Sequence, residues 1–215
     1  VTYAAHATAM GGRDKRLSGD YPGRLSAALE ADPRVEMATF CAGGVGSHSQ
    51  RAAASVAGYQ KVIYIAQGLS RRVLGALDTA TFRPARRLVA AEVPLDFGAL
   101  HLRVARGYEL KPWFFEKLLG TYASSLTALR LGDVLFAGFP ADVSGEFSDD
   151  LARRAGAGLH VVPTSFNGGY VGYLTPSKHY DLPAEETRRM NFTGPEGGEM
   201  AVDLAGQLLE RLSEE

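Results

Sequence analysis

Glycine and proline interrupt this chain at short intervals and constrain its fold more than any other feature. The 215 residues include 25 Gly and 10 Pro, more than average usage for the two together. Both residues weaken the interiors of helices and strands and favour turns, so we expect short elements joined by many tight turns. Hydrophobic residues make up 46% of the chain, ample for a buried core. This composition excludes a disordered chain, collagen and a coiled coil.

Charge and cysteine content narrow the classes of partner and of metal site. Lys and Arg number 23 against 24 Asp and Glu, a formal net charge of -1, without the basic excess that phosphate-backbone binding requires. We therefore expect no nucleic-acid partner. Cys41 is the only cysteine, which excludes an intrachain disulfide and a cysteine-based zinc cluster. A metal ion would have to be bound by His, carboxylate or Tyr side chains.

The chain contains no apolar run of about 18 residues, the minimum for a membrane span. We therefore predict no transmembrane segment, and the N-terminus also lacks the basic and apolar regions of a signal peptide. The chain begins at Val1, without an initiator Met, in a sequence typical of the middle of a buried strand. We expect a fragment of a longer protein.

Strand and helix patterns alternate along the sequence and predict a single α/β domain over residues 1–215. One helix is expected to begin near Asp20, which can cap it, and to end before Pro33. One broken helix or two short helices fit 51–77. The other predicted helices are 112–119, 146–154 and 201–212; the predicted strands are 1–7, 35–42, 88–97, 100–104, 122–130, 134–139 and 159–165; and 167–195 is expected to be a loop.

Polar side chains at the ends of the predicted strands are the first candidates for a functional site. Strand ends fix their side chains, and the loops at those ends line clefts. Such a position is also where structural, hydrogen-bonded side chains occur, and for a lone His that role is the commoner one. The candidates are His6, His48, Ser49, Asp142, Tyr170 and Tyr173.

The glycine-rich loop 43–50 lacks the features of two common sites. It has neither the Lys and Ser/Thr ending of a P-loop nor the spacing of a dinucleotide fingerprint, which argues against nucleotide binding. Ser49 stands where a nucleophile elbow around Ser47 would need Gly, which argues against a serine hydrolase of the α/β-hydrolase type.

Five blocks of sequence follow one another in an informative order. They are Val1-Thr-Tyr-Ala-Ala-His6 with Leu17-Ser-Gly-Asp-Tyr-Pro-Gly23, Gly46-Ser-His-Ser-Gln50, Gly138-Phe-Pro-Ala-Asp142, Asn167-Gly-Gly-Tyr-Val-Gly-Tyr173, and Glu186-Thr-Arg-Arg-Met-Asn-Phe-Thr-Gly-Pro195. In this order the blocks resemble the neutral/alkaline non-lysosomal ceramidase family over nearly the whole chain. The resemblance implies an α/β fold with a mixed β-sheet covered by helices, and a chain that is the C-terminal portion of a larger catalytic domain.

The resemblance also implies a zinc site. Its ligands would be His6, Asp142 in place of the family's Glu, and Tyr173. The family's other zinc His lies in an upstream segment that this chain does not contain, and that segment is expected to complete the site. Ser49 stands at the position of the family's catalytic Ser, with Ser47 and Gln50 departing from the family motif.

The chemistry of these residue types agrees with what the resemblance implies. Imidazole and carboxylate suit zinc, and a tyrosine oxygen near the metal can bind it or stabilise an oxyanion. The implied reaction is hydrolysis of the N-acyl amide of ceramide or a similar N-acyl lipid to a fatty acid and an amine, with Ser49 and Tyr173 as catalytic residues. Family members are commonly exported or membrane-associated, but the sequence itself encodes no address.

Several alternatives remain open at this point. Asp142 could cap the helix that contains Glu146, and Glu146 is a reserve ligand. Trp113, Phe114 and Phe115 could line an acyl-chain groove, although core packing is the commoner role at that spacing.

The chain could also be a non-catalytic relative that keeps the fold to bind a lipid, glycan or protein partner. The departures at Ser47, Gln50 and Glu185 motivate that alternative. A third alternative is a hydrolase of the same fold that acts on a different amide or ester.

Overall fold

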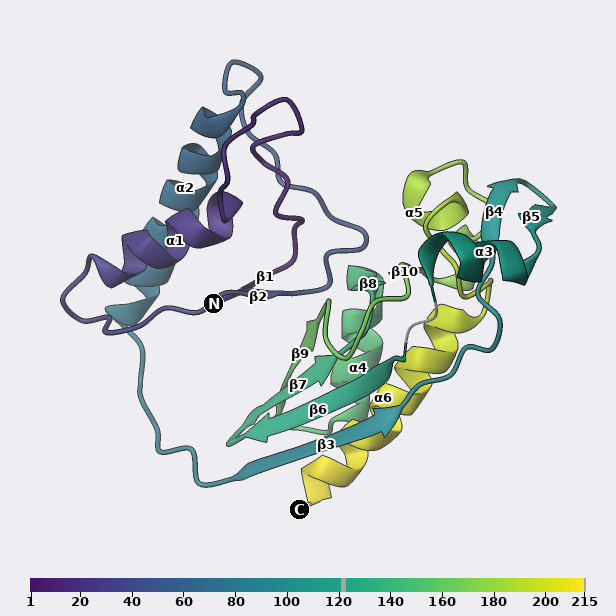
Figure 1. The fold of residues 1–215 in the computed structure, drawn as a ribbon. Coiled ribbons are helices and arrows are strands. Elements are labelled where there is room, and N and C mark those ends of the chain that lie inside the picture. Colours follow the sequence, from purple (N-terminus) through teal and green to yellow (C-terminus); the bar gives the residue numbers. More distant parts are fainter. Residues whose placement is uncertain (121–122, 215) are drawn as a thin grey trace.

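The computed structural model describes residues 1–120 and 123–214 and has the α/β architecture expected from the sequence. Two helices and a short strand pair from the N-terminal third form one part of the molecule. A mixed four-stranded sheet with helices on one face forms the other part, and the described C-terminal end lies beside this sheet (Figure 1).

The N-terminal part is built around two packed helices, α1 (Asp20–Glu30) and α2 (Tyr59–Leu77). Helix α1 begins and ends as predicted. Helix α2 is one continuous helix that begins at Tyr59, later than the predicted 51–77. Apolar residues recur three and four positions apart on the facing sides of the two helices, which gives each a buried stripe. The buried residues of this core are Ala9, Tyr21, Leu25, Leu29, Val62, Ile65 and Ala66.

The strands predicted at 1–7 and 35–42 are much shorter in the structure. Strand β1 (Thr2–Tyr3) pairs in parallel with β2 (Cys41–Ala42), and β1 is exposed where a buried strand was expected. Side chains of α1 satisfy the backbone that follows β1. The Tyr21 hydroxyl donates to the Ala5 carbonyl, and the Asp20 carboxylate accepts the N–H groups of Ala9 and Met10. These bonds replace the ladder that a longer strand would have needed. The Asp20 carboxylate therefore braces this loop. The expectation that Asp20 caps α1 is wrong, because the N-cap position is Gly19 and no side chain caps the helix.

The central sheet has the order β3-β6-β7-β9 and contains both kinds of pairing. Its strands are β3 (Leu88–Pro94), β6 (Ser125–Leu131), β7 (Val134–Gly138) and β9 (His160–Thr164). The first three are antiparallel, and β9 runs parallel to β7. All four were predicted, with ends that differ by a few residues; residue 122 of the predicted strand 122–130 lies outside the described residues.

The hairpin between β6 and β7 was also predicted. Leu131 pairs with Val134, which leaves Gly132 and Asp133 as a two-residue turn. Gly132 has a φ of 59°, a conformation that glycine adopts without strain and that tight hairpin turns require. The sequence of the turn therefore fixes the register of this pair.

Two helices cover one face of the sheet, α4 (Ser148–Arg154) and α6 (Gly197–Glu214). Both were predicted, although a short 3-10 helix at Gly145–Phe147 precedes α4. The buried Arg130 side chain donates to the carbonyls of Leu212 and Ser213, and so satisfies acceptors at the C-terminal end of α6. The largest fully buried side chains of this core are Leu126, Leu135, Phe139, Val143, Leu151, Val171, Leu174 and Leu209.

The remaining elements lie at the other end of α6 from the described C-terminus (Figure 1). They are β4 (Leu102–Ala105), β5 (Tyr108–Leu110), α3 (Pro112–Leu119), a 3-10 helix at Ser177–His179, and α5 (Glu185–Arg188). Helix α3 has the predicted bounds, but β5 was not expected.

The three aromatic residues of α3 are not equally buried. Phe115 is 2% exposed and packs on Phe192, whereas Trp113 is 58% and Phe114 is 38% exposed. The core role expected for all three is therefore correct only for Phe115.

The segment 167–195 is more ordered than the predicted loop. It contains β10 (Tyr173–Leu174), which pairs in parallel with β8 (Asp142–Val143). Among the described residues, no helix has both the length and the apolar character needed to cross a membrane.

We predict that Leu209→Ala lowers the free energy of unfolding by about 2–5 kcal/mol, because it leaves a cavity under α6. Leu204→Ala on the same helix is the control, since Leu204 is partly exposed and its replacement should cost far less. Urea denaturation measures both variants. Equal losses for the two would show that α6 does not pack on the sheet as described.

Candidate active site

Two short parallel strands place the first pair of candidate residues side by side. Asp142 in β8 is the register partner of Tyr173 in β10, and the Asp142 N–H donates to the Gly172 carbonyl at 2.9 Å. Two residues that are 31 positions apart in the sequence are thereby fixed next to each other by backbone hydrogen bonds.

The glycine-rich loop 43–50 packs directly against β8. The Gly46 N–H donates to the Val143 carbonyl at 2.9 Å. A Cβ atom at position 46 would lie 2.3 Å from the Asp142 carbonyl oxygen, so only glycine fits there without moving the backbone. This close approach brings the N-terminal part of the molecule to the strand that carries Asp142.

His6 completes the group from the chain that follows β1. The His6 N–H faces the His48 carbonyl at 3.4 Å, which holds residue 6 beside the loop 43–50. Its Nε2 atom lies 3.5 Å from Asp142 Oδ1 and 3.0 Å from the Tyr173 hydroxyl oxygen. The structure therefore brings together the three side chains that the family resemblance implied as ligands.

Asp142 is a nearly buried carboxylate whose two oxygens have different surroundings. The residue is 2% exposed, and the Tyr170 hydroxyl donates to Oδ2 at 2.6 Å. Oδ1 is buried and accepts no hydrogen bond from the described residues. Burial raises the pKa of Asp142 above its ordinary value, and the Tyr170 hydrogen bond and nearby His6 offset only part of that effect. A buried carboxylate oxygen without a donor is costly, and a bound cation would relieve that cost.

The two tyrosines of the site keep their protons at neutral pH. Burial, followed by the charges of Asp142, Glu186 and Glu185, raises the pKa of Tyr173 to about 12. Burial and the hydrogen bond to Asp142 raise the pKa of Tyr170. Both hydroxyls can therefore donate hydrogen bonds, and that of Tyr170 already does so.

Two separations among the candidate donor atoms are compatible with a small divalent cation. Zinc bonds of about 2.0–2.1 Å in a tetrahedral site place neighbouring ligand atoms about 3.3 Å apart. The 3.0 Å and 3.5 Å separations at His6 Nε2 lie on either side of that value. The described residues contain no group of three or more His, Cys, Asp or Glu arranged to hold a metal ion. The site thus has two common zinc ligands and a phenol, and its binding of zinc stays a prediction.

Ser49 lies in the loop 43–50 that packs against β8, but it makes no contact that assigns it a role. It is exposed and forms no side-chain hydrogen bond among the described residues. The residues on both sides of Ser49 bond to the segment that follows β1. The His48 carbonyl accepts the His6 N–H, and Gln50 Nε2 donates to Thr8 Oγ1 at 3.3 Å. Ser47, by contrast, forms a side-chain hydrogen bond, since its Oγ accepts the Gly145 N–H at 3.0 Å.

Glu146 is engaged with partners other than the candidate ligands. Its carboxylate lies 2.6 Å from Lys178 Nζ and 2.7 Å from His179 Nε2, and these contacts lower its pKa. The alternative in which Asp142 caps the following helix is wrong. Ser144 fills that position, and its Oγ accepts the Glu146 N–H at 3.3 Å.

Phe166 is a site residue that the sequence analysis missed. Its φ of 66° is unusual for a residue with a side chain and is of the kind that occurs at functional sites. The conformation places its ring 6.4 Å from the His6 ring and 6.2 Å from the Tyr170 ring. Nothing in the local sequence marks the strained backbone, so Phe166 could not be found from sequence patterns.

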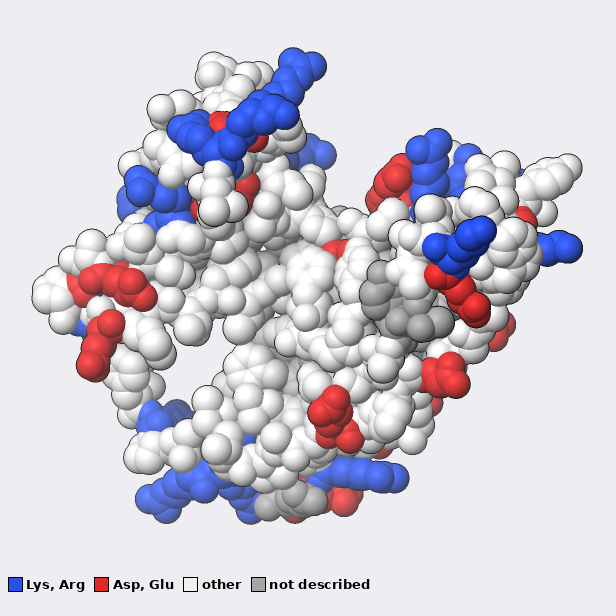
Figure 2. Space-filling view, viewed as in Figure 1, with Lys and Arg blue, Asp and Glu red and all other residues white. Residues whose placement is uncertain are grey.

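A largely apolar cavity of about 1050 Å³ opens next to Phe166. It lies between the N-terminal part and the sheet face that α4 and α6 leave open, and Figure 2 shows the hollow there. The side chains lining it include Phe40, Ala90, Leu129, Phe136 and Phe166. The cavity therefore shares a wall, Phe166, with the His6 and Asp142 group.

Comparison with solved structures identifies the architecture. A neutral ceramidase from Pseudomonas aeruginosa superposes with a TM-score of 0.71 at 17% sequence identity, covering 98% of this chain and 44% of the ceramidase chain. The chain has the fold of the neutral ceramidases. A ceramidase complexed with C2 gives a TM-score of 0.79 at 16% identity, covering 99% of this chain and 45% of that one.

The chain thus spans less than half the length of these ceramidase structures. At this level of identity the similarity is one of fold. No protein-family model matches the sequence, and no curated protein matches it.

The raised pKa of Asp142 gives a pH-dependent prediction for the metal-free protein. The folded state binds the Asp142 proton more tightly than the unfolded state, where the pKa is about 3.9. Stability should therefore fall as the pH rises from below that value through the raised folded pKa. Asp142→Asn removes this titration, so the variant should gain stability relative to the original chain as the pH rises toward neutrality.

Urea denaturation at a series of pH values, with a chelator present, measures this difference. Asp133→Asn, at an exposed carboxylate in the hairpin turn, is the control and should run parallel to the original chain. Parallel curves for Asp142→Asn as well would contradict the burial of an ionisable Asp142.

Proposed function

We propose that this chain is part of a ceramidase-like hydrolase, a zinc-dependent amidohydrolase that cleaves the N-acyl amide of ceramide or a similar N-acyl lipid. The observation that carries the proposal is the convergence of Asp142 and Tyr173 on His6, whose Nε2 atom lies within 3.5 Å of an oxygen of each. The ceramidase fold supports the reaction class, because the same fold is found in proteins described as ceramidases.

The proposed site assigns a separate task to each side chain. His6 Nε2 and Asp142 Oδ1 would hold the zinc ion, which when bound supplies Lewis acidity and a water of lowered pKa. Tyr170 holds the Asp142 carboxylate in place through its hydrogen bond to the other oxygen. Tyr170 is therefore a positioning residue.

Tyr173 and Ser49 would act on the substrate. The Tyr173 hydroxyl keeps its proton at neutral pH and lies at the donor group, where it can contact the metal or donate to the oxygen of an attacked carbonyl. Ser49 is exposed on the loop beside His6, from which it could assist at the same carbonyl.

A lipid substrate is supported by the cavity beside Phe166. Its largely apolar wall suits a hydrocarbon chain, and its shared wall with the His6 group would place the polar amide near the donor atoms. The polar amide would then lie where the apolar cavity meets the donor atoms.

Zinc should bind to this chain and stabilise it through His6 and Asp142. A ligand that binds only the folded state, at about 100 times its Kd, adds about 2.7 kcal/mol to the free energy of unfolding. We expect a stabilisation by zinc that is lost in His6→Ala and in Asp142→Asn. His160→Ala, at an exposed histidine of β9, should keep the full effect. Zinc binding unchanged in the first two variants would refute the proposed ligands.

Tyr173→Phe should lower kcat for ceramide hydrolysis about 10²–10³-fold if its hydroxyl stabilises the oxyanion, with little change in KM. The exposed Tyr108→Phe is the matched control and should keep full activity. Release of fatty acid from a ceramide substrate measures both. Full activity of Tyr173→Phe would remove this residue from the mechanism.

A non-catalytic protein that binds a lipid, glycan or protein partner is the second candidate. It is favoured by one observation, the exposed Ser49 without side-chain hydrogen bonds among the described residues, in a loop that also departs from the family motif at Ser47 and Gln50. Binding of a ceramide analogue without zinc and without turnover would favour this candidate over the hydrolase.

A further inference from the structure

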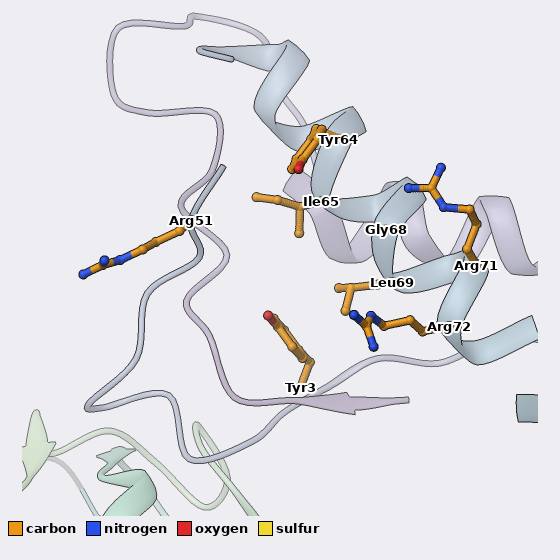
Figure 3. A pocket seen from close by; sticks show the side chains of 8 residues that line it. All are labelled: Tyr3, Arg51, Tyr64, Ile65, Gly68, Leu69, Arg71 and Arg72. Carbon is orange, nitrogen blue, oxygen red and sulfur yellow. The ribbon is translucent and has the colours of Figure 1, made fainter. Parts of the chain in front are cut away.

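A second concave site lies on the N-terminal part of the molecule, on helix α2. This groove has a volume of about 600 Å³, and Figure 3 shows the side chains around it. Helix α2 forms one wall, β1 contributes Tyr3, and the loop before α2 contributes Arg51. Its lining residues are Tyr3, Arg51, Tyr64, Ile65, Gly68, Leu69, Arg71 and Arg72.

The charge of the groove is entirely positive. Three arginines line it and no carboxylate does. Among the described residues, none of Arg51, Arg71 and Arg72 lies within ion-pair distance of an acidic side chain. The ion pairs of the structure are formed by other residues.

The surrounding part of the chain shares this excess. Residues 1–77 carry nine Lys and Arg against five Asp and Glu, a net charge of +4 in a chain whose total is -1. Three of the five acids are already occupied: Asp14 pairs with Arg16, Asp32 pairs with Arg34, and Asp20 accepts backbone N–H groups. The positive potential of the groove is therefore not neutralised locally.

The groove is also shaped to admit a ligand group. Tyr64, Gly68 and Arg72 are four residues apart on α2 and thus lie on one face of the helix. A Cβ atom at Gly68 would meet nothing within 4 Å, so the missing side chain leaves open space in the middle of that face.

Arg72 and Tyr3 bring polar groups to the groove from opposite sides. The Tyr3 ring packs edge-on against the buried Tyr21 ring at 6.1 Å, which fixes its direction. In Figure 3, Arg72 turns inward past Leu69 toward the Tyr3 hydroxyl, while the Arg51 and Arg71 side chains start at the rim and point away from the groove in this view.

We infer that this groove binds a phosphate group. Guanidinium groups form paired hydrogen bonds with phosphate oxygens, and the phenols of Tyr3 and Tyr64 add neutral donors that a phosphate can also use. The apolar floor formed by Ile65 and Leu69 suits a ligand whose phosphate is attached to an apolar body. The phosphate belongs either to a phospholipid headgroup or to a free phosphate compound. This inference does not depend on the proposed hydrolase activity.

The test compares two double variants that change the net charge equally. Arg71→Gln with Arg72→Gln removes two groove arginines, and Arg86→Gln with Arg87→Gln removes two exposed arginines outside it. Vesicles of phosphatidylcholine with and without phosphatidylserine test the headgroup in co-sedimentation, and inorganic phosphate tests the free compound in calorimetry. Each groove arginine is expected to contribute about fivefold to vesicle affinity.

A third variant separates the groove from its charge. Gly68→Phe fills the open space without altering any arginine, and it should abolish binding while circular dichroism shows the helix retained. Binding to phosphatidylserine vesicles or to inorganic phosphate that is lost in the groove variants and kept in the control supports the inference and identifies the source. Absence of binding to both probes overturns it, as does equal loss in the two double variants or binding by Gly68→Phe at the original affinity.

Discussion

The close approach of Gly46 to the backbone of β8 is the contact on which the candidate site depends. The N-terminal helices and the central sheet have separate hydrophobic cores, so the packing of either core alone would not place His6 beside Asp142. The hydrogen bond from Gly46 to Val143 joins the two parts. A second link runs from the Ser165 hydroxyl to the Gly43 carbonyl at 2.8 Å. Because a side chain at position 46 would collide with the Asp142 carbonyl, this contact requires glycine.

The buried carboxylate of Asp142 is unfavourable for the stability of the fold. A fold selected only for stability would place an apolar side chain or a fully hydrogen-bonded one in β8. Here Tyr170 satisfies one oxygen, and the other faces His6 Nε2 without a donor. Phe166 adds a strained backbone at the same place. Two unfavourable features beside one histidine are understandable when the group they surround is a site of binding or chemistry.

Local sequence patterns predicted the elements that are stabilised locally. Helices α1, α3 and α6 and the β6–β7 hairpin follow from apolar periodicity, from Pro112 at the start of α3 and from Gly132 in the turn. The strand predicted at 1–7 is short because side-chain bonds from Asp20 and Tyr21 satisfy part of the backbone after β1 instead of a ladder. In the strand predicted at 35–42, the Ala38 N–H donates to the Glu30 carboxylate and only Cys41 and Ala42 pair with β1. Strands β8 and β10 were missed because each is two residues long, and only pairing between distant segments defines them.

The candidate site was only partly predictable for the same reason. The resemblance to ceramidases indicated His6, Asp142 and Tyr173, and the structure places them together. The hydrogen bond of Tyr170 to Asp142, the engagement of Glu146 by Lys178 and the ring of Phe166 against His6 arise from tertiary packing, which no local pattern encodes.

The most direct measurement is the location of zinc by anomalous X-ray scattering from crystals of the zinc-loaded protein. The account predicts a zinc peak within about 2.0–2.2 Å of both His6 Nε2 and an Asp142 carboxylate oxygen. A peak at another histidine, such as the His179 and Glu146 pair, or no bound zinc at all, would contradict it.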